Sequence, residues 1–228
     1  MNLGVLFSGG KDSVFSAYYF IEQGWNVKCL ISLTPRNKDS YMFHTPNISM
    51  TKILSKALEI PLISEKTSGE KEKELIDLKK ALLKAKKKFN LEGIAVGALA
   101  SDYQQERVNR ICHELNLKTF APLWHKKPEM LLKEMIDLGF DFRISSVSAL
   151  GLNEKWLGRK IDLNALNELL ELEKKHGLHV AGEGGEFESI VLNGPIFKKR
   201  IEVIKAEKKM QNEFTGVYEI KKAVLKSN

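Results

Sequence analysis

The chain has 228 residues, of which 43% are hydrophobic and 29% are charged, and this composition is ordinary for a globular protein with a sizeable core. Its apolar runs are far shorter than the ~20 residues that a membrane-spanning helix needs, so we expect no membrane association. The run Leu3–Phe7 is also too short for the apolar region of a signal peptide, and a cytoplasmic location is therefore expected.

The net charge of +7 is compatible with a nucleic-acid partner or with a solvated, lysine-rich surface. Basic segments such as Lys79–Lys88 and Lys198–Lys209 contain no aromatic residues, which favours the solvated surface, so a nucleic-acid partner is not expected. Cys29 and Cys112 have no second thiol or histidine at metal-ligand spacing, and we expect both to be buried thiols.

Apolar runs and helical periodicities alternate through the first half of the chain. The predicted strands are Leu3–Phe7, Val27–Leu33 and Gly93–Leu99, and the predicted helices are Ser13–Gln23, Ile48–Leu58, Glu70–Phe89 and Gln104–Leu115. The alternation predicts an α/β domain over residues 1–125, with a doubly wound parallel sheet. Sheets of this class bind ligands beyond the carboxyl ends of their strands, so a crevice is expected there.

The predicted helix Glu70–Phe89 is amphipathic, and we place Leu75, Leu78, Leu82 and Leu83 on its apolar side. After Pro128 the rhythm changes. The predicted elements are helices at Glu129–Leu138 and Leu163–His176, a short strand between them, and β-like runs at Ser189–Leu192, Arg200–Lys205 and Gly216–Val224. Residues 126–228 are therefore expected to form a second, smaller α+β domain.

The segment Ser8–Ser13, with the sequence SGGKDS, connects the first predicted strand to the first predicted helix. Its two glycines let the backbone approach a ligand, and its N–H groups, with those of the first helical turn, form an anion-binding concavity. The serine hydroxyls and the lysine ammonium add donors, while Asp12 beside phosphate implies a bridging Mg²⁺ ion. The residues assigned to the nucleotide here are Ser8, Gly9, Gly10, Lys11, Asp12 and Ser13.

A flexible turn would explain two glycines, but not the whole string in this context. The string lacks the spacing of the mononucleotide P-loop and of the dinucleotide fingerprint. It resembles the pyrophosphate loop of the PP-loop ATP pyrophosphatases, a superfamily of the adenine nucleotide alpha hydrolase type. The resemblance implies that ATP is cleaved between its α- and β-phosphates, and that Lys11 and Asp12 take part in the catalysis. The loop would stabilise the charge of the departing pyrophosphate.

Other residues near the expected crevice are candidates for the same site. Asp102 either holds a metal or the incoming ammonium, or caps the helix that follows it. His44 could contact phosphate or adenine, although an ordinary loop histidine explains it nearly as well. The residues assigned to the nucleotide are Ser32, His44 and Gly97, and those assigned to the substrate are Ser101 and Tyr103.

The segment Gly182–Ser189, with the sequence GEGGEFES, places three glycines and three carboxylates in eight residues. A surface turn with solvated glutamates is the plain alternative. Together with the segments Met42–Asn47, Gly97–Val108, Ala121–Trp124 and Leu157–Asp162, it resembles the diphthine–ammonia ligase family. The resemblance covers nearly the whole chain, and the pairing of SGGKDS with GEGGEFES is more specific than either motif alone.

The resemblance implies a definite reaction. ATP would adenylate the carboxylate of diphthine, a modified histidine of translation elongation factor 2, and ammonia would then form the amide, with release of AMP and pyrophosphate. Diphthine carries a trimethylammonium group, which carboxylates and aromatic faces attract. We assign Glu183 and Glu186 to catalysis, together with Lys11, Asp12 and Asp102. The residues assigned to the substrate are Gly182, Glu183, Gly184, Gly185, Glu186, Phe187 and Glu188.

Two other functions stay open at this point. The basic charge and the same loop fit a tRNA-modifying ATP pyrophosphatase, and some relatives of the fold bind adenine nucleotides without turnover. The chain has no CxxC motif, which argues against the tRNA-thiolating branch, and no cysteine follows Met1, which argues against a built-in glutaminase. Free ammonia or a separate donor is therefore the expected nitrogen source. A homo-oligomer is compatible with the sequence.

Overall fold

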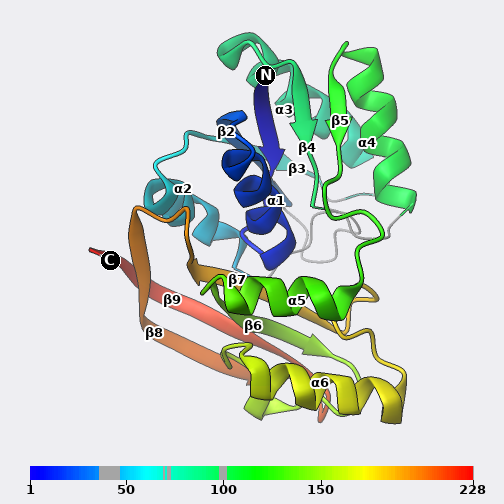
Figure 1. The fold of residues 1–228 in the computed structure, drawn as a ribbon, viewed down its shortest axis with the longest axis vertical. Helices are drawn as coiled ribbons and strands as arrows, with labels where there is room; N and C mark the ends of the chain where they lie inside the picture. The colour runs from blue at the N-terminus through cyan, green and yellow to red at the C-terminus, as the bar shows by residue number, and fades with distance from the viewer. Residues whose placement is uncertain (36–46, 69, 71–72, 98–101, 228) are drawn as a thin grey trace. The chain divides into compact units, whose positions relative to one another are not determined.

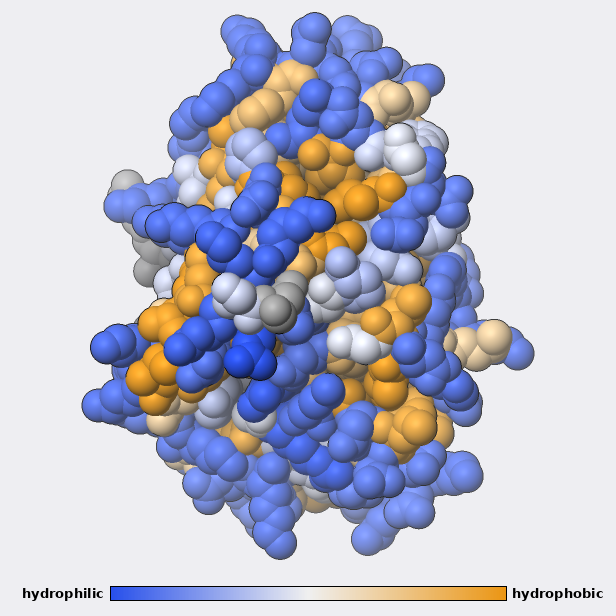
Figure 2. Space-filling view, turned by 60° about the vertical axis from the view of Figure 1, so that its left-hand side comes forward, coloured by the Kyte–Doolittle hydropathy of each residue, from blue (hydrophilic) through white to orange (hydrophobic). Residues whose placement is uncertain are grey.

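The computed structural model describes residues 1–35, 47–68, 70, 73–97 and 102–227. The chain divides into two compact units, Met1–Trp124 and His125–Asn228 (Figure 1). Among the described residues, none of the helices is long and apolar enough to span a membrane. Hydrophilic residues cover most of the face shown in Figure 2, in keeping with a chain that is 29% charged.

Unit 1 contains a five-stranded sheet within the described residues. Its strands are β1 (Asn2–Leu6), β2 (Asn26–Pro35), β3 (Leu62–Thr67), β4 (Gly93–Ala95) and β5 (Lys118–Phe120), in the spatial order β3-β2-β1-β4-β5. These neighbours pair in parallel. The chain therefore runs outward from β1 to β3, crosses back, and continues through β4 and β5 on the other side of β1. This arrangement confirms the predicted doubly wound α/β fold, with its switch point between β1 and β4.

Four α-helices and one 3₁₀ turn connect the strands in the described part of unit 1. They are α1 (Lys11–Glu22), η1 (Ile48–Met50), α2 (Thr51–Leu58), α3 (Lys73–Phe89) and α4 (Asp102–Glu114). Strands β3 and β5 are absent from the predicted elements. Both lie at an edge of the sheet, where one side of a strand stays exposed; β3 carries polar residues at Ser64, Glu65 and Lys66, and β5 has only 3 residues. Such strands lack the continuous apolar run that revealed the central ones.

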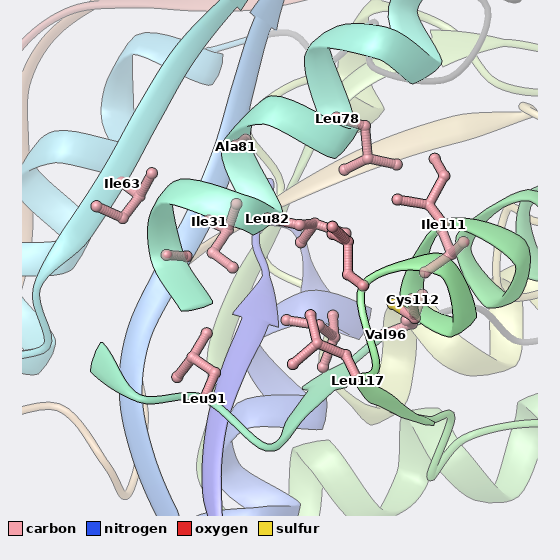
Figure 3. Close-up of a cluster of buried hydrophobic side chains, with 14 of the residues drawn as sticks. Ile31, Ile63, Leu78, Ala81, Leu82, Leu91, Val96, Ile111, Cys112 and Leu117 are labelled. Carbon is pink, nitrogen blue, oxygen red and sulfur yellow. The ribbon is translucent and has the colours of Figure 1, made fainter. Parts of the chain in front are cut away.

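A buried aliphatic cluster packs α3 and α4 against one face of the unit 1 sheet (Figure 3). Helix α3 contributes Leu75, Leu78 and Leu82 to it, but Leu83 is 38% exposed, so its predicted place on the apolar side is wrong. Leu83 lies eight residues after Leu75, which turns it ~80° away from Leu75 and further still from Leu78, at about 100° per residue. The buried face of α3 extends from Leu75 to the side away from Leu83, where Leu78, Leu82 and Ala85 lie.

Both cysteines of the chain belong to the same cluster. Cys29 and Cys112 are fully buried and free, as predicted. Burial raises the pKa of the Cys29 thiol to about 12, and it also raises the pKa of the Cys112 thiol. Neither side chain is therefore a thiolate at neutral pH, and both serve as small hydrophobic residues.

Unit 2 contains an antiparallel four-stranded sheet within residues 125–227. Its strands are β6 (Asp141–Ser148), β7 (Phe187–Asn193), β8 (Lys199–Met210) and β9 (Thr215–Ser227), in the order β7-β6-β9-β8. The helical elements are α5 (Pro128–Asp137), η2 (Glu154–Trp156) and α6 (Leu163–His176). These elements confirm the predicted smaller α+β part of the chain.

The ends of α6 follow from local chemistry. The Asp162 carboxylate accepts a hydrogen bond from the Ala165 N–H at 2.9 Å, and Gly177 ends the helix in the left-handed conformation with a φ of 72°. These are the usual N-cap and C-cap devices, so the helix has the bounds that its sequence indicates. The segment that follows α6 leads to the glycine-rich loop.

Replacing Leu82 with alanine should destabilise unit 1 far more than replacing its neighbour Leu83. Leu82 is fully buried, so the truncation leaves a cavity and should cost about 2–5 kcal/mol, whereas the exposed Leu83 should cost less than ~0.5 kcal/mol. Urea unfolding of the two variants measures the difference. Equal losses would contradict the described orientation of α3.

Candidate active-site loops

The segment Ser8–Ser13 begins after β1, at the switch point of the sheet, and ends inside the first turn of α1. Gly10 is the N-cap residue, and the Val14 N–H donates to its carbonyl at 3.1 Å. The N–H groups of Lys11, Asp12 and Ser13 therefore precede the first hydrogen bond within the helix. Together with the helix dipole, these three N–H groups make this end of α1 suitable for an anion.

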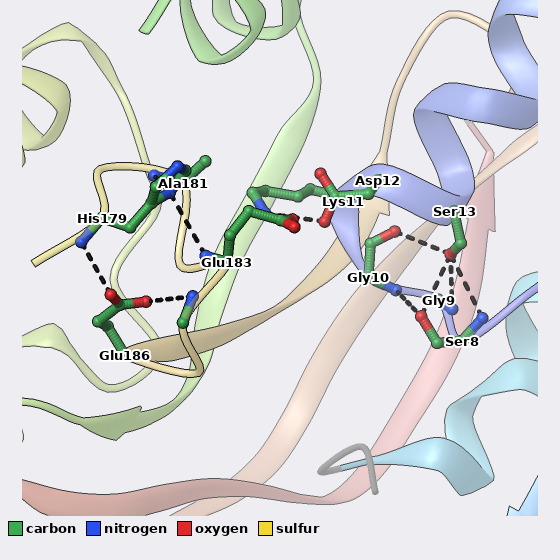
Figure 4. A network of polar contacts seen from close by, with 11 residues as sticks. Ser8, Gly9, Gly10, Lys11, Asp12, Ser13, His179, Ala181, Glu183 and Glu186 are labelled. Carbon is green, nitrogen blue, oxygen red and sulfur yellow. Dashed lines mark hydrogen bonds and ion pairs between the residues drawn. The ribbon is translucent and has the colours of Figure 1, made fainter. Parts of the chain in front are cut away.

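Two serine hydroxyls close the loop on itself (Figure 4). The Ser13 hydroxyl accepts the Ser8 and Gly9 N–H groups at 3.3 and 3.2 Å, and it donates to the Gly10 carbonyl at 3.0 Å. The Ser8 hydroxyl accepts the Gly10 N–H and donates to the Ser13 hydroxyl, both at 3.3 Å. Sequence reasoning assigned these hydroxyls to the ligand, and it missed the bonds by which they shape the loop.

The charged pair of the loop is formed by Lys11 and Asp12. The Lys11 Nζ lies 2.8 Å from the Asp12 Oδ2, and Lys11 is only 4% exposed. The other carboxylate oxygen, Asp12 Oδ1, is buried and has no hydrogen-bond partner among the described residues. A buried oxygen of this kind usually has a partner, so Asp12 has an unused acceptor for a metal ion or a ligand.

Gly97 lies against the start of α1. A Cβ atom added at Gly97 would stand 2.7 Å from the Asp12 carbonyl carbon and 2.8 Å from both the Asp12 oxygen and the Ser13 nitrogen. These are backbone atoms, which cannot swing away as a side chain could. The neighbouring Val96 carbonyl accepts the Ser16 hydroxyl at 3.4 Å. The segment after β4 is thus held directly on the first turns of α1.

Ser32 lies next to the entrance of the loop. The Phe7 N–H donates to the Ile31 carbonyl at 2.8 Å, which places the following residue of β2 beside the beginning of Ser8–Ser13. Ser32 is 1% exposed, and its hydroxyl has no hydrogen-bond partner in the described ranges. The structure therefore brings Ser32, Gly97 and the loop together at the carboxyl edge of the sheet.

The remaining unit 1 candidates are defined less fully. His44 and Ser101 lie outside the described residues. Asp102 is the first residue of α4 and is exposed, and Tyr103 follows it in the helix, with a side chain outside the described part. Of the two residues assigned to the substrate in unit 1, the structure therefore describes only the backbone of Tyr103, in the first turn of α4.

The glycine-rich segment of unit 2 forms a tight turn before β7. Gly182 and Gly185 have φ angles of 74° and 86°, which residues other than glycine rarely adopt. A Cβ at Gly184 would stand 2.7 Å from the Glu186 Oε1. The Glu186 carboxylate accepts the His179 N–H at 2.9 Å and the Gly184 N–H at 2.8 Å (Figure 4). The segment is a hydrogen-bonded loop with a defined glycine pattern, and more than a turn with solvated glutamates.

The next three residues belong to strand β7. Phe187 is 2% exposed, and its ring packs against Gly182, where an added Cβ would lie 3.2 Å from the ring atom Cδ1. Glu188 and Ser189 pair with Ser146 and Ile144 of β6. Of the three glutamates of the motif, Glu183 lies between the glycines of the turn, Glu186 follows them, and Glu188 belongs to β7.

Sequence reasoning missed His179, which stands three residues before the glycine turn. Its Nδ1 accepts the N–H groups of Ala181 at 3.2 Å and of Glu183 at 3.4 Å. The signal was weak, because a lone histidine after a helix is common and no spacing rule connects it to a glycine-rich motif. Its role emerges only when the turn is folded.

Comparison with known proteins adds an independent finding. The family model of the diphthamide synthase N-terminal domain matches residues 1–119, and that of the C-terminal domain matches residues 127–226. Proteins named diphthine–ammonia ligase from Bos taurus and Homo sapiens are each 38% identical to this chain, covering 91% of it and 84% of their own length. The Saccharomyces cerevisiae protein of that name is 32% identical, over 87% of this chain and 34% of its own length. Among solved structures, a predicted subunit of a tRNA methyltransferase from Methanocaldococcus jannaschii covers 85% of this chain and 98% of its own, with a TM-score of 0.41 and 16% identity.

Replacing Gly97 with alanine should weaken nucleotide binding. The new Cβ would force the start of α1 to shift, at an overpacking cost of about 1–3 kcal/mol, and ATP affinity should fall about tenfold or more. Calorimetric titration with ATP measures the effect. Gly24→Ala is the matched control, because a Cβ there meets no atom within 4 Å, although its φ of +74° makes the substitution strained. It should cost about 1 kcal/mol of stability and leave ATP affinity unchanged. Equal ATP affinity in Gly97→Ala and the wild type would contradict the close packing of Gly97 on α1.

Proposed function

The chain belongs to the diphthine–ammonia ligase family, and we propose that its loop Ser8–Ser13 binds ATP while the glycine turn of unit 2 recognises the cationic substrate. The protein is an ATP-dependent ligase of diphthamide synthesis. The match of both family domains over nearly the whole chain carries this conclusion, and the loop geometry supplies the candidate mechanism. The substrate bears diphthine, and we propose that its carrier is translation elongation factor 2, in the cytoplasm where that factor works.

The reaction that we propose has two steps. A carboxylate oxygen of diphthine attacks the α-phosphorus of ATP, the bond to the bridging oxygen breaks, and pyrophosphate leaves. Ammonia then attacks the acyl carbon, AMP leaves, and the nitrogen loses a proton as the amide forms. The protein must therefore stabilise negative charge on pyrophosphate in the first step and exclude water from the acyl adenylate before the second.

The first turn of α1 is suited to the charge of pyrophosphate. Its N–H groups, the helix dipole and the Lys11 ammonium all favour an anion at this place. The internal bonds of Ser8 and Ser13 hold the loop in shape before the ligand arrives, so little rearrangement is needed when the charge develops. Support for the assignment comes from the position of the loop at the switch point of the sheet.

A Mg²⁺ ion fits Asp12. The described residues contain no group of three or more His, Cys, Asp or Glu side chains that could hold a metal ion, so a closed protein cage is not present there. Mg²⁺ in nucleotide sites is usually bound by one or two carboxylates together with phosphate oxygens and water. The unpartnered Asp12 Oδ1 offers one such oxygen. When bound, the ion would neutralise phosphate charge, while Lys11 holds the other oxygen of Asp12.

Glu183 and Glu186, the first two glutamates of the unit 2 loop, have different roles in this proposal. Both oxygens of Glu186 accept backbone N–H groups, so this side chain shapes the loop. Glu183 lies in the turn that Glu186 holds, and we assign its carboxylate to the trimethylammonium of diphthine or to the incoming ammonium. A trimethylammonium group donates no N–H hydrogen bond, so a nearby negative charge is the main attraction that a carboxylate can offer.

A tRNA-thiolating activity finds no support in the cysteines. Cys29 and Cys112 are the two cysteines of the chain, both lie in the core of unit 1, and burial raises the pKa of each thiol. Sulfur transfer through a cysteine needs a thiolate that a substrate can reach. The basic surface is also partly neutralised by its own acids, because Lys209 and Lys221 both pair with Glu219 in the β8–β9 hairpin.

Incubation of the pure protein with ATP and ammonium should yield AMP only when elongation factor 2 bearing diphthine is also present. AMP is measured by chromatography, and amidation by the mass of the elongation factor, since the amide is ~1 Da lighter than the acid. Bulk tRNA serves as the competing acceptor. AMP formation that depends on tRNA would support the tRNA-modifying alternative, and tight ATP binding without turnover would support the nucleotide sensor.

Replacing Glu183 with glutamine should raise the KM for the diphthine-bearing factor about tenfold and leave ATP affinity unchanged. The lost attraction between two partly solvated charges is about 1–2 kcal/mol, and 1.4 kcal/mol corresponds to a factor of ten. Glu213→Gln, at an exposed position between β8 and β9, is the matched control and should behave as the wild type. An unchanged KM in Glu183→Gln would refute the recognition role.

A further inference from the structure

Two side chains hold four backbone N–H groups of one short segment in unit 2. The His179 Nδ1 accepts those of Ala181 and Glu183, and the Glu186 carboxylate accepts those of His179 and Gly184 (Figure 4). The two sets of bonds share His179. Its backbone N–H donates to Glu186, and its ring accepts the Glu183 N–H. We call this set of bonds the His179–Glu186 lock.

The segment before the turn has contacts in addition to the lock. Val180 and Ala181 are 2% and 0% exposed, and the Val180 N–H also donates to the Glu173 Oε1 at 3.3 Å. Within residues 182–185, the Gly182 N–H donates to the His179 carbonyl at 2.8 Å and the Gly185 N–H to the Gly182 carbonyl at 3.1 Å. The lock holds Glu183 itself, whose N–H donates to the His179 Nδ1.

The ring nitrogen of His179 is suited to this task. A nitrogen that accepts two N–H groups uses its lone pair, so the proton of the imidazole is on Nε2 in this arrangement. An asparagine side chain places an acceptor oxygen the same number of bonds from Cα, whereas glutamine places it one bond further away. The asparagine and glutamine variants of His179 therefore separate the effect of the acceptor atom from the effect of the size of the ring.

We propose that His179 is a positioning residue that acts through Glu183. By accepting the Glu183 N–H, it fixes the backbone from which the Glu183 carboxylate meets the cationic substrate. The inference rests on the proposed recognition role of Glu183, and it extends that role to a residue outside the glycine-rich motif.

Hydrogen exchange of backbone amides in the free full-length protein tests the lock directly. In His179→Ala and His179→Gln, the amides of Ala181 and Glu183 should exchange on the order of tenfold faster than in the wild type, because each loses its acceptor. In His179→Asn, exchange should stay close to the wild-type rate. His113→Ala, at an exposed position on α4, is the control and should leave these amides unchanged. Unchanged exchange in His179→Ala would overturn the proposal.

Kinetics with the diphthine-bearing factor then test whether His179 acts through Glu183. His179→Ala should raise the KM for this substrate by a factor similar to that of Glu183→Gln, leave the KM for ATP unchanged, and be rescued by His179→Asn. The double variant His179→Ala/Glu183→Gln should be no worse than Glu183→Gln alone, because one interaction is lost twice. Multiplying effects would overturn the proposal, since His179 would then act independently.

Separate measurements test the ligase function and the positioning role of His179. Amide formation by the wild-type protein establishes the function whatever the His179 variants do. If the wild type is active but Glu183→Gln keeps its KM, the positioning role is overturned together with the recognition role, even when exchange shows that the hydrogen bonds exist.

Discussion

The close approach of the Gly97 backbone to the first turn of α1 is the constraint on which the candidate ATP site depends. The sheet order puts β4 beside β1, so the segments that leave these two strands meet at the switch point. A Cβ at position 97 would stand less than 3 Å from backbone atoms of Asp12 and Ser13. Only glycine therefore lets the segment after β4 pass without moving the start of α1. This packing holds the start of α1 in place, and the N–H groups of that helix end are suited to an anion.

Both loops solve the same physical problem. A segment rich in glycine loses much conformational entropy on folding, and it has few side chains with which to pack. In unit 1, the hydroxyls of Ser8 and Ser13 hold the loop backbone; in unit 2, the His179 ring and the Glu186 carboxylate do so. Each bond contributes only about 0.5–1.5 kcal/mol, but several bonds on one short segment select one conformation. Some polar residues of each segment therefore shape its backbone.

The sequence predicts the central strands, the longer helices and the switch-point position of the loop, because these follow from apolar periodicity and from the order of elements. It does not predict β3 and β5, because β3 carries polar residues at Ser64, Glu65 and Lys66 and β5 has only 3 residues, so neither has a continuous apolar run. It also misplaces Leu83, because the buried face of α3 extends to the other side of Leu75 through Ala81 and Ala85, which a pattern of leucines does not reveal. The candidate site is predicted by residue type, but the roles of Ser13, Glu186 and His179 depend on backbone N–H directions that exist only in the folded chain.

The division of labour among Glu183, Glu186 and Glu188 bears on how such motifs are interpreted. Three carboxylates in eight residues suggest a strongly negative site, yet both oxygens of Glu186 are occupied by backbone donors and Glu188 belongs to the β6–β7 pairing. A carboxylate that accepts two N–H groups still carries its charge, but that charge is partly compensated by the donor dipoles. The recognition role proposed above is assigned to Glu183 because it lies between the glycines of the turn. In this proposal, recognition depends on where the backbone places the Glu183 side chain, so that His179, a residue outside the motif, takes part by holding the Glu183 N–H.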